Sequence, residues 1–346
     1  MNILVTGGAG YVGSIVTEEL VKKGHKVVVV DSLKQGHRSA VHPDAELVIF
    51  DVADKERLDR LFFRINFDAV MHLAGETVIE HSMTDPKRYF HNNIIGGINL
   101  IDIMLRHHVN KLIYSSTAAT YGEPIETPIT ENHPTTPVNS YGESKLIFER
   151  ILNWYGQAYG LKHITFRYFN AAGASEQYGE DHRPETHLIP NVLAAAPPDK
   201  ASVNVFGSDY PTRDGSCIRD YVHVLDIAQA HLLALDKINE LNGQVYNLGS
   251  GEGYSVLEVI EAASRIIGDM IPVKICPRRP GDPAVLTASP EKARKELGWT
   301  PRFTSLESIL QSAWLWSKRH PQGYSDLPRL ESVNVSIGRT RTKVPV

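Results

Sequence analysis

The sequence predicts an α/β protein in which a doubly wound parallel sheet is joined to a smaller, mixed α/β domain. Short apolar runs alternate with amphipathic runs from residue 2 to about residue 170. Nearly continuous apolar strands of this kind are typical of a sheet with helices on both faces. A glycine-rich turn follows the first apolar run, and an aspartate ends the second. From residue 171 the alternation is lost and many of the 20 prolines occur, which indicates a second, loop-rich domain.

Composition limits the classes of function. The chain has 346 residues, of which 42% are hydrophobic and 22% charged, as in ordinary globular proteins. A net charge of -4 offers no basic surface for nucleic acid. The two cysteines, Cys217 and Cys276, are too few for a disulfide framework, and no apolar run reaches the ~20 residues of a membrane span. We expect a cytoplasmic protein that binds neither nucleic acid nor membranes.

The first unit reads as strand, glycine turn, helix and strand. Asn2–Thr6 is apolar, Gly7–Gly13 contains the pattern Gly-x-Gly-x-x-Gly, and an amphipathic run leads to the apolar segment Lys26–Asp31. Glycines at this spacing permit a tight turn and let backbone N–H groups approach a pyrophosphate at a helix N-terminus. This context predicts a Rossmann-type dinucleotide site.

Asp31 points to the type of dinucleotide. It lies about 20 residues after the glycine turn, at a strand end, where a carboxylate accepts the adenosine ribose hydroxyls. A carboxylate there repels a 2′-phosphate, so we expect NAD rather than NADP. Lys34 and Arg38 are near enough in sequence to leave NADP open.

The later elements continue the alternation. The expected strands are Glu46–Phe50, Asp68–Leu73, Lys111–Ser116 and His163–Asn170. The expected helices are Lys55–Arg64, Pro86–His107 and Ser144–Tyr159. A helix over Val222–Asp236 and a strand over Gln244–Leu248 are expected to rejoin this sheet. Ligands bind beyond the carboxyl ends of such strands, and there the polar residues Asp31, Asp51, Thr117 and Asn170 are found.

These elements suggest the domain limits. We expect an NAD-binding domain over residues 1–172, which segment 219–249 rejoins. A substrate domain is expected over residues 173–320, interleaved with the first. The tail 321–346 lacks a helical period, so we expect it to be poorly ordered.

Tyr141 and Lys145 are the candidate catalytic pair. Residues four apart on a helix are neighbours, and a cation beside a phenol lowers the pKa of that phenol from its usual value of about 10. The phenol can then act as a base near neutral pH. Tyr-x-x-x-Lys alone is a common spacing, and Tyr141 also suits an ordinary surface position at a helix start.

Longer stretches give the pair a context, because the chain resembles the extended short-chain dehydrogenase/reductases, and more closely the UDP-glucose 4-epimerases. The wider family is marked by Thr6–Gly13, His72–Gly75, Tyr114–Gly122 and Tyr141–Lys145. Nucleotide-sugar enzymes are marked by Arg167–Gly173, Asp209–Thr212, Arg219–Val224 and Arg278–Asp282. The resemblance covers residues 1 to about 318.

The resemblance implies an NAD-dependent enzyme that inverts C4 of a UDP-sugar through a transient 4-keto sugar. Tyr141 and Thr117 would bind the C4 hydroxyl, and Lys145 would lower the pKa of Tyr141 and bind the nicotinamide ribose. The implied cofactor-binding residues are Gly7, Gly10, Tyr11, Val12, Gly13, Asp31, Asp51, Val52, Leu73, Ala74, Gly75, Asn93, Tyr141, Lys145 and Tyr168. The implied substrate-binding residues are Thr117, Asn170, Leu188, Phe206, Arg219, Arg279, Asp282 and Leu286.

Several of these substrate residues have expected partners. Arginine forks match phosphate oxygens, so Arg219 and Arg279 are expected on the diphosphate, where Asn170 would also donate. Asp282 would hold the uridine ribose and Phe206 would pack near the uracil. We treat Arg213 and Arg278 as solvated surface charges and Cys217 as a small filler. The 15 histidines show no metal-ligand spacing, so no metal is expected. A homodimer through Pro86–His107 and Ser144–Tyr159 is expected.

Three places in the chain refine the reaction, the substrate and the cofactor contacts. Related dehydratases carry an Asp-Glu pair where this chain has Ala118 and Ala119; without an acid or base there, return of hydride is favoured over elimination. Leu286 replaces either a bulky aromatic or a small residue and favours UDP-glucose/UDP-galactose. Glu76-Thr77 stands where some relatives have a lysine near the cofactor phosphates. Epimerases of UDP-N-acetylhexosamine, UDP-pentose or UDP-uronate, and a non-catalytic NAD-binding protein, remain alternatives.

Overall fold

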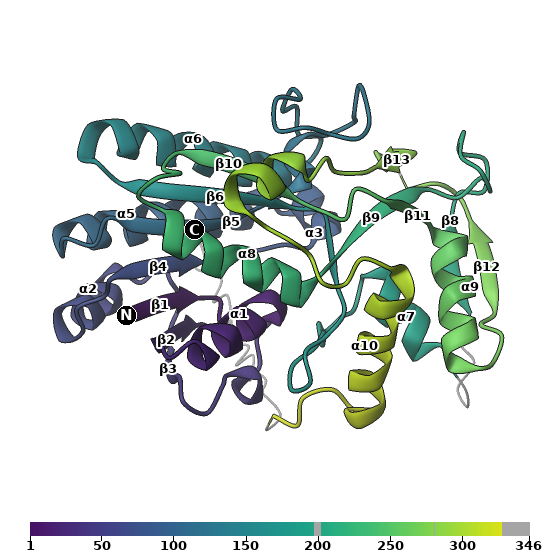
Figure 1. Cartoon of the computed structure of the whole chain (residues 1–346), viewed down its shortest axis with the longest axis horizontal. Helices are drawn as coiled ribbons and strands as arrows, with labels where there is room; N and C mark the ends of the chain where they lie inside the picture. Colours follow the sequence, from purple (N-terminus) through teal and green to yellow (C-terminus); the bar gives the residue numbers. More distant parts are fainter. Residues whose placement is uncertain (197–201, 280, 327–346) are drawn as a thin grey trace, which may run out of the picture.

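The main sheet has seven parallel strands in a computed structural model that describes residues 1–196, 202–279 and 281–326 (Figure 1). Their order is β10-β6-β5-β4-β1-β2-β3. The strands are β1 (Asn2–Thr6), β2 (Lys26–Asp31), β3 (Glu46–Ile49), β4 (Ala69–His72), β5 (Lys111–Thr117), β6 (Lys162–Tyr168) and β10 (Gln244–Leu248). The predicted doubly wound parallel sheet is confirmed.

The strand order reverses at β1, which pairs with β2 on one side and with β4 on the other. In register, Thr6 at the end of β1 lies opposite Val30 of β2 and His72 of β4. Such a reversal opens a crevice beyond the carboxyl ends of the strands. The glycine turn after β1 therefore lies where a parallel sheet offers a binding site.

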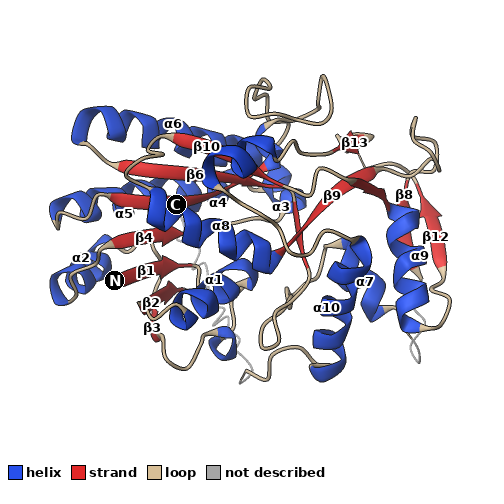
Figure 2. Cartoon of the chain, viewed as in Figure 1, coloured by secondary structure: helices blue, strands red, loops and turns tan. Residues whose placement is uncertain are grey.

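Helices cover both faces of this sheet (Figure 2). One apolar core combines the sheet with residues of α1 (Tyr11–Lys22) and α8 (Val224–Lys237). The opposite core combines it with residues of α2 (Lys55–Arg64), α5 (Gly96–Arg106) and α6 (Ser140–Tyr159). Strands enclosed in this way need apolar residues on both sides, which explains their continuous apolar runs.

Two expected helices differ in detail. The helix expected over Pro86–His107 consists of α4 (Pro86–Phe90), a π-helical turn over His91–Ile95 and α5, and α3 (Ile79–Thr84) precedes it. The helix expected from Ser144 begins at Ser140, because Asn139 caps it by accepting a 2.8 Å hydrogen bond from Gly142 N–H. Its first turn is polar, so apolar periodicity alone could not locate the start.

The second part of the molecule lies to the right in Figure 1. Its strands are β7 (Asn170–Ala172), β9 (Ile218–His223), β11 (Gly253–Ser255) and β13 (Val285–Leu286), with β8 (Val203–Phe206) and β12 (Val273–Cys276) as a separate pair. Its helices are α7 (Leu188–Ala194), α9 (Val256–Ile267) and α10 (Leu306–Arg319). The remaining short turns of helix are Arg38–Ala40, Ala118–Thr120 and Ala293–Leu297. A third apolar core lies among α7, α9 and α10.

The segment expected to be helical from Val222 is a strand as far as His223, and α8 begins only at Val224. The strand is β9, which pairs with β7, β11 and β13. At Val222 and His223 the partner is β7, and this pairing outweighs the local helical pattern. After α8, the chain returns to the main sheet as β10, which pairs with β6.

The end of the described chain is packed, unlike the poorly ordered tail that the sequence predicted. Tyr324 is only 7% exposed, and its hydroxyl accepts a 3.0 Å hydrogen bond from Gly179 N–H. Asp326 accepts hydrogen bonds from the N–H groups of Arg38 and Ser39. These contacts come from one buried aromatic ring and one fixed carboxylate, and single residues of this kind leave no periodic pattern in the sequence. Residues 327–346 lie outside the described residues.

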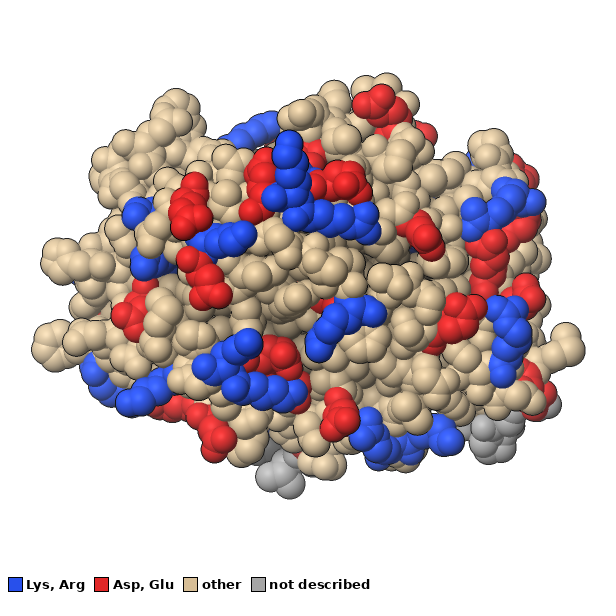
Figure 3. Space-filling view, in the orientation of Figure 1, with Lys and Arg blue, Asp and Glu red and all other residues tan. Residues whose placement is uncertain are grey.

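Within the described ranges, no helix is long and apolar enough to cross a bilayer. Figure 3 shows basic and acidic side chains intermingled over the face it presents. This mixture agrees with the small net charge of -4.

Candidate active site

The glycine turn closes tightly around its own backbone. Gly7 has φ +75°, and a Cβ there would lie 2.5 Å from Ala74 N. A Cβ on Gly13 would lie 2.0 Å from the carbonyl oxygen of Gly7. The turn leads directly into α1, whose first residues are Tyr11 and Val12. The first N–H groups of a helix lack intrahelical partners, so this cradle fits the diphosphate of a dinucleotide.

Two aspartates follow at neighbouring strand ends. Asp31 closes β2 and accepts hydrogen bonds from Ala9 N–H (3.1 Å) and Leu33 N–H (2.8 Å), so its carboxylate is fixed beside the glycine turn. Asp51 accepts a 2.6 Å ion-paired hydrogen bond from Lys34. Burial raises the pKa of Asp51, but hydrogen bonds from Lys34 and the backbone outweigh it and lower the pKa overall. Lys34 and Asp51 thus form an ion pair with each other.

Gly75, Asn93 and Lys145 come together beyond the end of β4. A Cβ on Gly75 would lie 3.0 Å from Asn93 Oδ1 and 3.2 Å from Lys145 Nζ. Asn93 is fixed by three hydrogen bonds, two with the backbone of Glu76 and one to Ser144 Oγ at 2.9 Å. Gly75 and Asn93, both expected on the cofactor, therefore share one small region with the lysine of the candidate pair.

Thr117 and Tyr141, which the sequence predicted to share the C4 hydroxyl of the substrate, lie close together. Thr117 ends β5, and its hydroxyl lowers the pKa of the Tyr141 phenol at the start of α6. Thr117 Oγ1 also accepts the N–H of Ala119 at 3.1 Å. A hydroxyl that already accepts one hydrogen bond still has its proton to donate, so Thr117 can donate to the oxygen of Tyr141.

The pKa of Tyr141 differs from the expectation. Burial raises the pKa of the phenol above its usual value, and the hydrogen bond from Thr117 opposes this increase. The sequence predicted that Lys145 lowers this pKa, but in the structure desolvation and the hydroxyl of Thr117 are what shift it. Lys145 Nζ instead donates a 3.0 Å hydrogen bond to the carbonyl oxygen of Ser115.

Lys145 is buried but remains basic enough to carry a charge. Burial lowers the pKa of Lys145 to about 8, and the charge of Glu149 opposes this decrease. Glu149 lies one turn further along α6 and is itself held by Arg167, with nitrogen–oxygen distances of 3.1 and 2.6 Å, and by Ser116. The lysine is thus predominantly protonated at neutral pH, and a buried ion pair supports it.

A second buried network, which sequence reasoning missed, supports Tyr168. His231 Nδ1 lies 2.9 Å from the carbonyl oxygen of Ile227 and must donate to it, so Nε2 is the accepting nitrogen. Tyr168 then donates its hydroxyl to His231 Nε2 at 2.8 Å and accepts from Ser115 Oγ at 2.7 Å. Burial lowers the pKa of His231 to about 4, which keeps it neutral. Its only sequence signal was a histidine inside an otherwise apolar helix face.

The cluster of expected substrate residues is assembled around β9. Arg219 is ion-paired with Asp282 and lies opposite Leu286 in the register of β9 and β13. Burial raises the pKa of the Cys217 thiol, while the charges of Arg219 and Arg279 lower it. Both predicted arginines are therefore close to Cys217.

The other substrate candidates lie around this cluster. The guanidinium of Arg279 lies 4.0 Å from the ring centroid of Phe206. Asn170 donates a 3.1 Å hydrogen bond to the carbonyl oxygen of Asp220, where the chain passes from β6 to β7. Leu188 is the first residue of α7. Leu286 packs against an apolar cluster that includes Ala118, which brings the substrate part next to Thr117.

The two arginines expected to be solvated both have partners. Arg278 lies 4.1 Å from the ring centroid of Tyr210 and donates to Asp209 at 2.7 Å. Arg213 is ion-paired with Glu258. Each partner is distant in sequence, so the contacts could not be read from spacing.

Comparisons with known proteins agree with this arrangement. A model of the NAD dependent epimerase/dehydratase family matches residues 3–249. The chain belongs to this family. Its cofactor is NAD, which the glycine cradle and Asp31 fit.

The most informative relatives are UDP-glucose 4-epimerases. One from Halalkalibacterium halodurans is 49% identical over 329 residues, which cover 94% of this chain and 98% of that protein. The crystal structure of a UDP-glucose 4-epimerase superposes with a TM-score of 0.92 at 46% identity, covering 94% of this chain and all of that chain (100%). The enzyme of Bifidobacterium longum in complex with NAD+ and UDP gives 0.89 at 39% identity, with coverage of 94% and 100%.

Proposed function

We propose that this protein is an NAD-dependent epimerase that inverts C4 of a UDP-sugar, with UDP-glucose and UDP-galactose as the substrate pair. The observation that carries the proposal is the Thr117 hydroxyl beside the phenol of Tyr141, on the same helix as Lys145, which meets Gly75 of the expected cofactor site. The names of the relatives support the substrate class. When bound, NAD supplies a hydride acceptor that is restored within each turnover.

Proton transfer at the sugar is assigned to Tyr141. Its phenol oxygen takes the proton of the C4 hydroxyl as the 4-keto sugar forms and returns that proton at the end of the cycle. Because burial raises the pKa of the phenol, this role requires positive charge nearby. Lys145, which is cationic at neutral pH, supplies part of that charge, and the nicotinamide of bound NAD+ adds to it.

Thr117 and the two alanines that follow it determine which reactions are open to the 4-keto sugar. Thr117 donates to the oxygen of Tyr141 and so stabilises the phenolate form. Ala118 and Ala119 form the short helical turn that follows, and neither side chain can act as an acid or base. The 4-keto sugar thus has no partner for elimination in this turn, and inversion is favoured.

The UDP part is assigned to the residues around β9. Arg219 and Arg279 supply positive charge for the diphosphate, Asp282 an acceptor for the ribose, and Phe206 an apolar face for the uracil. Asn170 has a second amide hydrogen available for the diphosphate, since one is used on Asp220. While UDP stays anchored, the keto sugar can rotate, so that C4 would present its opposite face to the bound nicotinamide.

The test is incubation of the purified protein with UDP-galactose while the sugar anomeric proton is followed by NMR. Formation of UDP-glucose without net oxidation is expected. If no UDP-glucose forms even with added NAD, the proposal is wrong. UDP-N-acetylgalactosamine and UDP-arabinose serve as parallel substrates that test the alternative sugar classes.

A single substitution tests the role of Tyr141. We expect Tyr141→Phe to bind NAD and UDP almost normally but to lower kcat by about 100- to 10,000-fold, the usual contribution of a general acid–base group. Near-normal turnover in Tyr141→Phe would remove the phenol from the mechanism.

We further propose a homodimer that uses the surface of α6 and the helix before it. Three large apolar side chains are exposed there, with exposed fractions of 68% for Trp154, 65% for Tyr159 and 48% for Ile95. Exposed apolar patches on helices are typical of protein–protein interfaces. The mass in solution, measured by light scattering, should be that of a dimer and should fall to that of a monomer in Trp154→Glu. A monomeric mass for the unsubstituted protein would refute this.

A further inference from the structure

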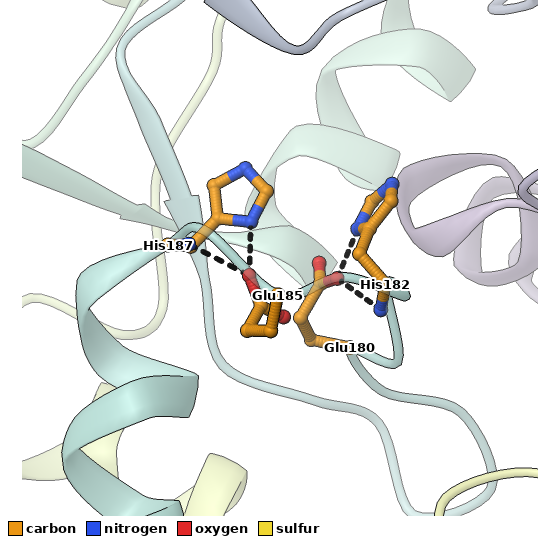
Figure 4. Close-up of side chains that lie close together, drawn as sticks. All are labelled: Glu180, His182, Glu185 and His187. Atoms are coloured by element: carbon orange, nitrogen blue, oxygen red, sulfur yellow. Dashed lines mark hydrogen bonds and ion pairs between the residues drawn. The ribbon is translucent and has the colours of Figure 1, made fainter. Parts of the chain in front are cut away.

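A cluster of two carboxylates and two imidazoles lies on the segment that joins β7 to α7, at the border of the site described above. Glu180, His182, Glu185 and His187 each offer a ligand atom, and these atoms all lie within 4.8 Å of one another. Figure 4 shows the four side chains gathered at one place, with a carboxylate hydrogen-bonded to each imidazole. The cluster has no periodic signal in the sequence, because its spacing, Glu-x-His-x-x-Glu-x-His, is not helical.

The geometry is close to that of a four-ligand metal site. Metal–ligand bonds of about 2.0–2.2 Å place the ligand atoms of a tetrahedral site about 3.4 Å apart. The four ligand atoms now lie within 4.8 Å of one another, so the widest pair would have to close by at most about 1.4 Å to reach that separation. Two imidazole nitrogens and two carboxylate oxygens form a donor set that suits zinc and neighbouring first-row transition ions.

The backbone already orients both carboxylates. Glu180 accepts the N–H of His182 at 3.1 Å, and Glu185 accepts the N–H groups of Thr186 and His187 at 2.7 Å each. In both residues Oε1 takes these bonds and also the imidazole Nδ1. Among the described residues Oε2 of neither glutamate has a hydrogen-bond partner. Fixed carboxylates with a free oxygen are the arrangement that holds metal ligands in place.

The position of the cluster gives such an ion a structural role. His182 lines a small cavity together with Gly10 and Tyr11 of the glycine turn. His187 directly precedes Leu188, the first residue of α7. An ion bound here would tie together residues 180–187, which lie between the glycine turn and the start of α7.

We propose that Glu180, His182, Glu185 and His187 bind one divalent transition-metal ion of the zinc class, which holds the segment before α7 in place. The competing account is that the four side chains form two independent Glu–His ion pairs and bind no metal. The two accounts differ in metal stoichiometry, which is independent of epimerase activity. Failure of this proposal would therefore leave the proposed function untouched, and the reverse also holds.

The test uses the full chain with NAD bound and without an affinity tag. After treatment with a chelator and removal of that chelator, Zn²⁺ is titrated against a chromophoric competitor and the metal content is measured by mass spectrometry. We expect one Zn²⁺ per chain with a Kd of about 1 µM or lower. At 100-fold excess of free Zn²⁺ over Kd, the Tm should rise by roughly 4 °C.

The matched variants carry the same two changes in different places. Glu185→Gln with His187→Gln should lose the stoichiometric Zn²⁺ and the rise in Tm. Glu80→Gln with His81→Gln, two exposed residues on α3, should retain both. Stoichiometric binding that survives in the first variant, or its absence from the unsubstituted protein, would overturn the proposal.

A measurement on the unsubstituted protein covers the case in which the cluster variant does not fold. Co²⁺ added in place of Zn²⁺ should give the visible absorption of a low-coordinate nitrogen–oxygen site, at one equivalent per chain. If only the pink, weakly absorbing spectrum of aqueous Co²⁺ appears, the four residues are ion pairs that bind no metal, and the proposal is wrong.

Discussion

Substitution of Thr117 separates the catalytic role proposed for it from its structural one. Thr117 donates to the phenol of Tyr141 and accepts the N–H of Ala119 at 3.1 Å. Thr117→Val keeps the shape of the side chain but removes both hydrogen bonds. Thr117→Ser keeps the hydroxyl and serves as the control.

The two losses have different sizes and different readouts. The bond to Ala119 caps a short helical turn, and loss of such a cap costs about 1 kcal/mol of unfolding free energy. The bond to Tyr141 acts on a phenolate, and a hydrogen bond to a charged group contributes about 1.5–3 kcal/mol. If this bond is made in the transition state, its loss lowers kcat by about 10- to 100-fold.

The dependence of kcat on pH identifies the cause. The hydrogen bond from Thr117 lowers the pKa of Tyr141, so its removal should raise that pKa. The rising limb of kcat should then shift to higher pH in Thr117→Val, and part of the activity should return in alkaline buffer. Epimerisation of UDP-galactose from pH 6 to 10, with urea denaturation in parallel, measures both effects. A wild-type profile for Thr117→Val, or equal damage in Thr117→Ser, would refute the reasoning.

Three further changes test other contacts. Burial lowers the pKa of His163 to about 4. From about pH 6.5 to pH 4 the unfolded state therefore binds one more proton than the folded state, and the free energy of unfolding falls as the pH decreases. His163→Phe should reduce that slope by about 1.4 kcal/mol per pH unit in urea denaturation, and an unchanged slope would contradict this. Asp220→Asn should lower the unfolding free energy by about 3 kcal/mol or more, because its carboxylate accepts four hydrogen bonds; a loss below 1 kcal/mol would argue against this. Gly75→Ala should reduce kcat more than stability, because a Cβ would press on Lys145 and Asn93; unchanged kinetics would show that the lysine tolerates displacement.

The predictable features of this protein are those with a local signature. Apolar runs and the glycine spacing led to the sheet and the cradle at residues 7–13, because both depend on neighbouring residues. Apolar spacing predicted the helix that carries Lys145, but not its first turn, which carries Tyr141. The π-helical turn over His91–Ile95 and the strand β9 were missed, since packing partners distant in sequence decide them.

Other site features depend on residues that meet only in three dimensions. Tyr168 is held by His231, 63 residues away, and Glu149 by Arg167 on the adjacent strand β6. The cluster at residues 180–187 could be recognised only once its extended segment was folded. Such contacts leave no periodic pattern in the sequence, because each depends on how the chain folds between the two residues.

The sequence by itself determined which groups are available: a phenol and an ammonium one helical turn apart, a hydroxyl at the end of β5, and no acid at Ala118 or Ala119. Only the tertiary structure decided the protonation of those groups. Burial raises the pKa of Tyr141 and lowers that of Lys145 to about 8. Desolvation depends on every atom packed around a charge, and that environment is assembled from segments far apart in the chain.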